Sequence, residues 1–236
     1  MATAHCEWGP NGMLAFRERA RVLVIVDVLS FSTAVDVAVA RGASIVPFPL
    51  GDREAAAKAA EEAGAVLASA TRGGSYSLAP SSLETIPPGT KLLLPSPNGS
   101  RLSLMGGEAV VFAGCLRNAR AVAAAALRAA QGGDIAVIPA GERWRLDDSL
   151  RPAIEDLIGA GAVLDALGLE LSPEAQVARD AYLSAKPALA ETIWQSISGR
   201  ELIDRGFPRD VALAVEAGVS TAAPLLTGGV YRNANA

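Results

Sequence analysis

Residues 21–27 read Arg-Val-Leu-Val-Ile-Val-Asp, a run of five aliphatic side chains that ends in a carboxylate. An unbroken aliphatic run predicts a strand that is buried on both faces, as in a parallel sheet covered by helices. The hydroxyl groups of residues 30–33, Ser-Phe-Ser-Thr, can then cap a helix that extends to Ala40. This stretch therefore predicts one strand, one polar loop and one helix.

The same unit recurs along the chain. Further strands are expected at residues 45–48, 66–68, 92–94, 109–113, 135–138 and, at an edge, 229–231. Helices are expected at residues 54–62, 119–130, 149–169 and 210–217, and from residue 173 onward. Strands that alternate with helices indicate an α/β fold, a three-layer α/β/α sandwich with a mostly parallel or mixed sheet. We expect residues 1–236 to form a single α/β domain; the alternative is two lobes, 1–130 and 131–236, with the site between them.

The composition excludes several classes of protein. Half of the 236 residues are apolar and 19% are charged, which favours a folded chain. The formal net charge of -4 offers no basic surface for nucleic acid. The aliphatic runs are too short to span a membrane, and residues 1–10 lack the pattern of a secretory signal. We therefore expect a cytoplasmic protein that binds neither nucleic acid nor membrane, and whose alanine and valine content would permit a homodimer.

The chain has a single histidine, His5, and two cysteines, Cys6 and Cys115. Mechanisms that need two histidines are excluded, and His5 lies close to a chain end that we expect to be mobile. Cys115 lies between a strand and a helix N-terminus, where the pKa of a thiol tends to fall. A cysteine nucleophile therefore stays open beside the simpler interpretation of a small buried residue. Acid–base and metal chemistry would otherwise depend on carboxylates.

Polar residues follow the expected strands at the points where the strands end. In a parallel sheet these carboxyl ends lie at one edge, which is where ligands bind. Arginine side chains, the backbone N–H groups of an Asn-Gly turn and a helix N-terminus can all bind phosphate, sulfonate or carboxylate groups. Taken singly, an Asn-Gly pair indicates only a turn, and a single arginine is more often a solvated surface residue. The candidate substrate-binding residues are Arg72, Asn98, Gly99, Ser100, Arg117, Asn118 and Arg143.

Carboxylates are the second part of the expected site. Asp27 follows an aliphatic strand, where an unpaired charge is costly, so it caps a helix, pairs with a cationic side chain or binds a metal ion. Mg²⁺ needs few carboxylate ligands and keeps several of its waters. The candidate metal ligands are Asp27, Glu142, Asp147 and Glu155, although Asp147 can equally charge a helix start. Asp27 and Glu142 are also the candidate catalytic residues, with Glu142 as general acid or base.

Five segments resemble the 2-phosphosulfolactate phosphatase family, in matching order over residues 20–168. They are residues 24–33, 97–100, 114–118, 139–143 and 155–162. Residues 6–9, Cys-Glu-Trp-Gly, resemble a bacterial subgroup of the family. The resemblance implies a three-layer α/β/α enzyme that uses Mg²⁺ to hydrolyse 2-phospho-3-sulfolactate to sulfolactate and phosphate, a step of coenzyme M biosynthesis.

The chain departs from the family pattern at positions 71 and 30, where Thr71 replaces a carboxylate and Ser30 replaces an arginine. The leading hypothesis is magnesium-dependent hydrolysis of a small acidic phosphomonoester, with 2-phospho-3-sulfolactate as the first candidate. If the replaced side chains act directly in catalysis, the chain hydrolyses another ester or none. The alternative is therefore a non-catalytic small-anion-binding protein derived from this family.

Overall fold

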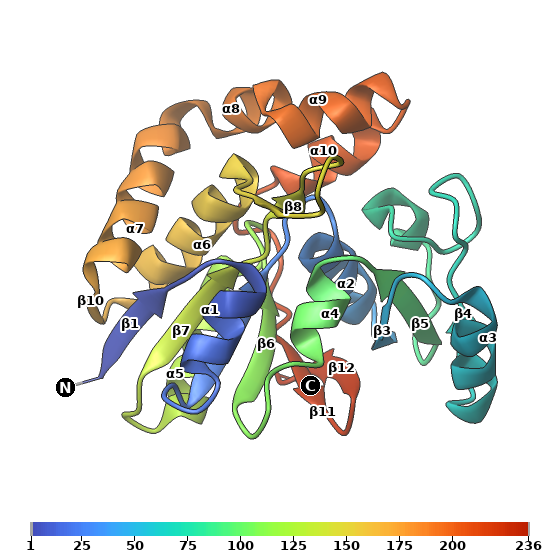
Figure 1. The fold of residues 1–236 in the computed structure, drawn as a ribbon, viewed down its shortest axis with the longest axis horizontal. Coiled ribbons are helices and arrows are strands. Elements are labelled where there is room, and N and C mark those ends of the chain that lie inside the picture. Colours follow the sequence, from blue (N-terminus) through green and yellow to red (C-terminus); the bar gives the residue numbers. More distant parts are fainter. Residues whose placement is uncertain (1, 236) are drawn as a thin grey trace.

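The computed structural model describes residues 2–235. Within them, ten strands form one sheet in the order β10-β1-β7-β2-β6-β11-β12-β3-β5-β4 (Figure 1). These strands are β1 (Thr3–Cys6), β2 (Val22–Val26), β3 (Ser44–Pro49), β4 (Val66–Leu67), β5 (Lys91–Ser96), β6 (Val110–Gly114), β7 (Ile135–Pro139), β10 (Glu170–Leu171), β11 (Pro224–Thr227) and β12 (Val230–Asn233). Two further strands, β8 (Glu142–Arg143) and β9 (Leu150–Arg151), form a separate antiparallel hairpin.

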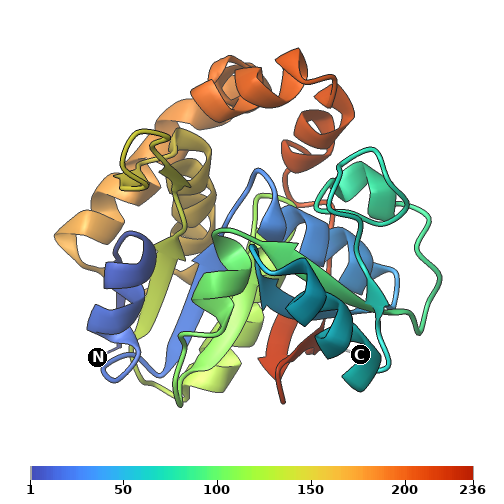
Figure 2. The ribbon, with the colours of Figure 1, turned by 45° about the vertical axis from the view of Figure 1, so that its right-hand side comes forward.

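Helices cover both faces of the sheet, and later ones form an arc above one edge. The α-helices are α1 (Gly9–Phe16), α2 (Phe31–Ala40), α3 (Arg53–Glu62), α4 (Gly99–Ser103), α5 (Ala119–Ala130), α6 (Ile154–Leu167), α7 (Pro173–Ala185), α8 (Leu189–Gln195), α9 (Ile197–Asp204) and α10 (Pro208–Ala214). Two 3₁₀ turns are η1 (Pro80–Leu83) and η2 (Lys186–Ala188). Figures 1 and 2 show α7 to α10 arching over the sheet. Among residues 2–235 no helix is both long and apolar enough to cross a membrane.

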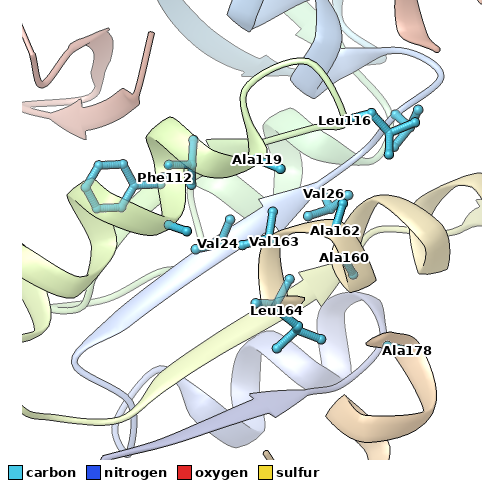
Figure 3. Packing of buried hydrophobic residues seen from close by; sticks show 14 of the residues in the cluster. Val24, Val26, Phe112, Leu116, Ala119, Ala160, Ala162, Val163, Leu164 and Ala178 are labelled. Carbon is cyan, nitrogen blue, oxygen red and sulfur yellow. The ribbon is translucent and has the colours of Figure 1, made fainter. Parts of the chain in front are cut away.

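The β2 strand distributes its side chains between the two helical layers. Its three valines belong to a core shared with α5 and α6, whereas its leucine and isoleucine pack with α1 and α4. Figure 3 shows Val24 of β2 beside Val163 of α6. All five side chains of the strand are buried. The expected doubly buried strand and the three-layer α/β/α sandwich around a mixed sheet are therefore confirmed.

The sheet contains two sets of parallel strands that run in opposite directions. Strands β10, β1, β7, β2 and β6 are parallel to one another, as are β3, β5 and β4. The antiparallel hairpin β11–β12 lies between the sets and pairs with β6 on one side and β3 on the other (Figure 1). Twist of roughly 20–25° per strand turns the two sets across one another. Their carboxyl ends can therefore meet at one corner, although the two sets are opposed.

The chain end that we expected to be mobile is instead part of the sheet. Residues Thr3–Cys6 form β1, which pairs in parallel with β7 and β10, and α1 begins at Gly9. His5 therefore lies within a strand, where its Nε2 is 3.5 Å from Asp134 Oδ2. The sequence Thr-Ala-His-Cys has no aliphatic run, so the pairing that fixes it was not visible from local pattern.

Two other expected elements differ in extent or position. The helix expected at 149–169 begins only at Ile154, because Leu150–Arg151 pair with β8 instead. The strand expected at an edge, residues 229–231, lies in the middle of the sheet as part of β12. Its Tyr231 is fully buried, and the tyrosine oxygen lies 2.8 Å from the Ser103 hydroxyl on α4.

Truncating Tyr231 is expected to destabilise the protein because its ring fills the core under the central hairpin. Tyr231→Ala should lower the free energy of unfolding by about 3–5 kcal/mol, since it leaves a large cavity. Tyr231→Phe keeps the ring and loses only the hydrogen bond to Ser103, at a cost of about 1 kcal/mol. Urea denaturation of both variants measures the difference. Equal losses for the two would contradict a packing role for the ring.

Candidate active site

The carboxyl ends of β2, β5 and β7 meet at one corner of the sheet. Asp27 follows β2, Asn98 and Gly99 follow β5, and Glu142 lies beyond β7. The Gly99 amide donates to Asp27 Oδ2 at 2.9 Å, and Asn98 Nδ2 donates to Glu142 Oε2 at 3.0 Å. The structure thus brings together four of the candidate residues, from both sets of parallel strands.

Asp27 caps two helices at once. The amide of Phe31, the first residue of α2, donates to Asp27 Oδ1 at 3.1 Å, while the amide of Gly99, the first residue of α4, donates to Oδ2. Helix N-termini stabilise negative charge, so the pair of caps favours the carboxylate. The close approach requires a glycine at position 99, since a Cβ atom there would lie 2.2 Å from Cδ1 of the Phe31 ring.

A cavity of about 520 Å³ opens beside these residues. Asp27 and Glu142 line it together with three arginines, Arg53, Arg72 and Arg205. Its volume lies in the range of roughly 300–1,000 Å³ that is usual for small-molecule sites. Acidic and basic residues therefore line one open cavity, as a site for an anion bound with a cation requires.

The Arg72 side chain is fixed by a buried acid. Its Nη1 donates to Asp210 Oδ2 at 2.6 Å, and its Nη2 donates to Ser30 Oγ at 2.7 Å. Asp210, on α10, is fully buried and also accepts from the amide and hydroxyl of Ser81, at 3.1 and 2.6 Å. Burial lowers the pKa of Arg72, and the charge of Asp210 opposes that change. The arc of helices thus holds this guanidinium at the cavity.

Four carboxylates influence one another at this corner, because Glu155 and Asp156 of α6 join Asp27 and Glu142. Burial raises the pKa of Asp27 to about 6; its two backbone hydrogen bonds oppose the rise and the Glu155 charge adds to it. Burial, and then the charge of Asp27, raises the pKa of Glu142 to about 7. Burial and the same neighbouring charge raise the pKa of Asp156 well above its ordinary range. The negative charge that forms when one of these carboxyl groups ionises therefore makes ionisation of its neighbours less favourable.

Arg117 and Asn118 do not line this cavity. Arg117 forms ion pairs with Asp36 and Glu216. Asn118 Oδ1 accepts from the amide of Cys115 at 2.8 Å and closes the turn before α5. Both side chains form contacts within the fold, and neither lines the cavity, so their placement does not support the expected role in substrate binding.

Two further residues, Ser100 and Cys115, are buried inside the fold. The hydroxyl of Ser100, expected to bind substrate, donates to the Leu94 carbonyl at 2.9 Å. Cys115 is fully buried, and burial followed by the charge of Asp36 raises the pKa of its thiol to about 12. Desolvation outweighs the favourable hydrogen bonds that a helix N-terminus offers, so the structure agrees with the simpler interpretation of Cys115 as a small buried residue. A thiolate nucleophile at this position is therefore disfavoured.

The remaining candidates lie on the β8–β9 hairpin. Asp147 is exposed, and its carboxylate accepts from the amide and hydroxyl of Ser149, apart from the four carboxylates. Arg143 pairs with Asp148 at 2.9 Å. It lines a second cavity, of about 210 Å³, which shares Pro97, Asn98 and Glu142 with the larger one. Asp147 therefore has no structural support as a metal ligand.

Arg53, Arg205 and Asp156 belong to the site but were not among the candidates. Arg53 begins α3 and Arg205 follows α9, so neither comes directly after a strand and only tertiary packing brings them to the cavity. Asp156 had a signal in the sequence, because it lies beside Glu155 in the first turn of α6. A carboxylate pair at a helix start is common, so the sequence alone does not distinguish Asp156 from a residue that stabilises the helix dipole.

The donor set at this corner fits Mg²⁺. Among residues 2–235, no three histidine, cysteine or acidic side chains are arranged as a ready-made metal centre. Mg²⁺, however, prefers oxygen ligands, keeps several waters and often takes only one or two carboxylates. Asp27 and Glu142 both line the cavity, and their raised pKa values mean that the folded chain compensates their negative charge incompletely. A divalent cation would supply that compensation.

The stability of the metal-free protein should fall as the pH rises from about 4 to about 7. In this interval the carboxyl of Glu142 is ionised in the unfolded chain but still protonated in the folded one, because its pKa rises from 4.5 to about 7 on folding. The folded state then binds more protons, so each increase in pH favours unfolding. Asp27, with its pKa raised to about 6, acts in the same direction.

Urea denaturation in EDTA across this interval measures the effect. Glu142→Gln should flatten the fall in the free energy of unfolding, whereas Glu18→Gln, at a carboxylate whose side chain is 83% exposed, should leave it unchanged. A wild-type stability that rises with pH between about 5 and 7 would contradict the assignment.

Comparison with known proteins agrees with this geometry. The family model described as 2-phosphosulpholactate phosphatase matches residues 13–229. A curated relative, a probable 2-phosphosulfolactate phosphatase of Carboxydothermus hydrogenoformans, is 29% identical over 201 residues, which cover 81% of this chain and 80% of the relative. The match takes in β2, β5 and β7 and every residue of the corner they form. The chain therefore belongs to the 2-phosphosulfolactate phosphatase family, a family of phosphoric monoester hydrolases.

Proposed function

We propose that this protein is a magnesium-dependent phosphatase that hydrolyses 2-phospho-3-sulfolactate to sulfolactate and phosphate. The observation that carries the proposal is a single cavity lined by three arginines and by three acidic residues, of which Asp27 and Glu142 lie at the corner and Asp52 caps α3. Family membership supports phosphomonoester hydrolysis, and the name of the relative supports the sulfonated substrate.

The arginines suit a substrate with several anionic groups. Phospho-sulfolactate carries phosphate, sulfonate and carboxylate, each of which accepts forked hydrogen bonds from guanidinium. Arg72 is already oriented by Asp210, so it loses little freedom on binding. Arg53 and Arg205, on α3 and beyond α9, line the same volume and would bind the groups that do not react.

The carboxylates suit the chemistry at phosphorus. Mg²⁺ held by Asp27 and Glu142 would neutralise charge on the phosphoryl group and favour attack by water. Both oxygens of Asp27 accept backbone hydrogen bonds, which fixes its orientation and makes water, rather than this carboxylate, the proposed nucleophile. Glu142, whose pKa burial and the Asp27 charge raise to about 7 in the metal-free chain, is the proposed general acid or base. It would accept a proton from the water as the P–O bond to sulfolactate breaks, and return one to the leaving oxygen.

The alternative is a small-anion-binding protein without turnover. One observation favours it: Arg72 donates to Asp210 and to Ser30, and Ser30 is one of the two positions at which the resemblance described above implies a departure from the family pattern. A guanidinium whose N–H groups already donate to Asp210 and Ser30 has fewer hydrogen bonds to offer to a bound anion. In this case the ligand would raise the melting temperature with no phosphate released.

Several properties extend the proposal. We propose a cytoplasmic enzyme that acts on a small anionic substrate and has no nucleic acid or membrane partner. A homodimer is compatible with it, and the sulfolactate formed would serve coenzyme M biosynthesis or other sulfonate metabolism.

Phosphate release from 2-phospho-3-sulfolactate, phospholactate and an aryl phosphate, with and without Mg²⁺, tests the proposal. Metal-dependent turnover that prefers the sulfonated ester is the expected result. Turnover of only the other esters would refute the substrate and retain the chemistry. Thermal stabilisation by the sulfonated ester without release from any of the three would favour the binding protein.

Replacing Asp27 is expected to abolish metal-dependent turnover. Asp27→Asn keeps the shape and one acceptor but loses the charge at the metal, so kcat should fall by at least about 100-fold. The matched control is Asp147→Asn, at the exposed candidate on the β8–β9 hairpin, which should retain wild-type kcat and Mg²⁺ dependence. Full activity of Asp27→Asn, or loss of activity in the control, would remove Asp27 from the metal site.

Arg205 is expected to contribute to recognition of the sulfonate or carboxylate group. It is exposed, so Arg205→Ala should leave the melting temperature unchanged while raising KM for the sulfonated ester about tenfold. KM for an aryl phosphate, which lacks those groups, should stay within about threefold. The control is Arg209→Ala, which removes an exposed arginine that pairs with Glu84 and does not line the cavity. Equal changes in KM for both esters would contradict this role.

A further inference from the structure

Asp156 binds the backbone of two loops that carry the proposed chemistry. Its Oδ1 accepts from the amide of Val28 at 2.7 Å, and its Oδ2 accepts from the amide of Gly141 at 2.9 Å. Val28 directly follows Asp27, and Gly141 directly precedes Glu142. The side chain of Asp156 is buried in the first turn of α6. One carboxylate therefore connects the backbone next to one cavity-lining carboxylate with the backbone next to the other.

We propose that Asp156 is a positioning residue that sets the separation of Asp27 and Glu142. The proposal rests on the proposed function, because it assigns Asp156 to the machinery of that same cavity. Asp156 itself does not line the cavity; it acts through the two amides that it holds.

The geometry around Gly141 makes this contact specific. Gly141 has φ +69°, in the left-handed region that favours glycine, and a Cβ atom there would lie 2.6 Å from Cδ1 of Leu150. The chain pairs regularly up to this point, since the Ala140 amide still donates to the Val26 carbonyl at 2.8 Å. The left-handed residue then turns the chain out of the β2–β7 ladder, and its amide points to Asp156. The direction in which Glu142 leaves the sheet is thus fixed at the amide that Asp156 accepts.

Both acceptor positions of Asp156 are needed for this role. A carboxylate can accept from two amides on different segments, whereas an asparagine offers one oxygen and one N–H₂ group. In Asp156→Asn, one of the two amides would face a donor and lose its partner. The distance between the carboxylates of Asp27 and Glu142 would then no longer be fixed, although neither residue has been replaced.

The test compares Asp156→Asn with Asp165→Asn, an exposed carboxylate on the same helix. Three readouts are measured: kcat and KM with Mg²⁺ present, for an ester that the wild type hydrolyses; Mg²⁺ affinity by calorimetry on the metal-free protein without substrate; and hydrogen exchange of the segments containing Val28 and Gly141, with Mg²⁺ present. For Asp156→Asn we expect kcat to fall about 10–100-fold and Mg²⁺ affinity to weaken about tenfold. KM should stay within about threefold, because the arginines are untouched. Exchange should increase in both segments and in no other strand of the sheet, and Asp165→Asn should match the wild type in every readout.

Two results would overturn the proposal. If Asp156→Asn folds and its two segments exchange faster, yet kcat and Mg²⁺ affinity are those of the wild type, the spacing does not matter. If Mg²⁺ affinity collapses but kcat at saturating Mg²⁺ is unchanged, Asp156 is a metal ligand and not a positioning residue. Should the wild type hydrolyse none of the esters, the proposed function fails, while Mg²⁺ affinity and hydrogen exchange still decide whether Asp156 organises the site.

A second variant covers the case in which Asp156→Asn does not fold. Gly141→Ala disturbs the same amide from the other side, through its φ of +69° and the contact with Leu150, and leaves the Asp156 side chain intact. It should lower kcat by a similar factor with little change in KM. A folded Gly141→Ala enzyme with wild-type kcat and Mg²⁺ affinity would equally refute the proposal.

Discussion

The hydrogen bond from the Gly99 amide to the Asp27 carboxylate, at 2.9 Å, joins two sets of strands that run in opposed directions. In a flat sheet the carboxyl ends of β2 and β5 would lie at opposite edges. They meet here because a central hairpin and the accumulated twist rotate one set across the other. The rest of the corner depends on this contact: Asn98 can reach Glu142 only because Gly99, its neighbour, is held at Asp27.

The corner concentrates negative charge that the fold compensates only in part. Burial and mutual repulsion raise the pKa values of Asp27, Glu142 and Asp156, while backbone amides and helix N-termini work against the rise. Other buried acids have cationic partners, as Asp210 has Arg72 and Asp36 has Arg117, although burial still raises the pKa of Asp36. Asp27, Glu142 and Asp156 have raised pKa values and no salt-bridge partner among the described residues, and such a group beside a cavity is more typical of a functional site than of a structural ion pair.

Local pattern in the sequence was sufficient for the layers and for part of the site. The aliphatic run at 22–26 and the turn at 97–100 predicted both a buried strand and a polar loop at its end, because each signal lies within a few residues. The sequence could not show that residues 224–233 enter the middle of the sheet, since pairing partners more than a hundred residues away leave no local trace. It also could not separate Arg72, which faces the cavity, from Arg117, which is paired inside the fold. Both are arginines after a strand, and only tertiary contacts distinguish them.

The position of the β11–β12 hairpin has a consequence for how the chain is synthesised and folds. Every other strand of the sheet precedes residues 224–233, yet the hairpin occupies the centre of the sheet order. Until those residues leave the ribosome, β6 and β3 each present an unpaired edge, and the corner that holds Asp27 and Gly99 has no continuous sheet beneath it. Exposed edges of this kind promote association between chains, and contacts between distant segments form slowly. The nascent protein is therefore expected to depend on chaperones until the β11–β12 hairpin is in place, and to acquire its site only after residues 224–233 have been synthesised.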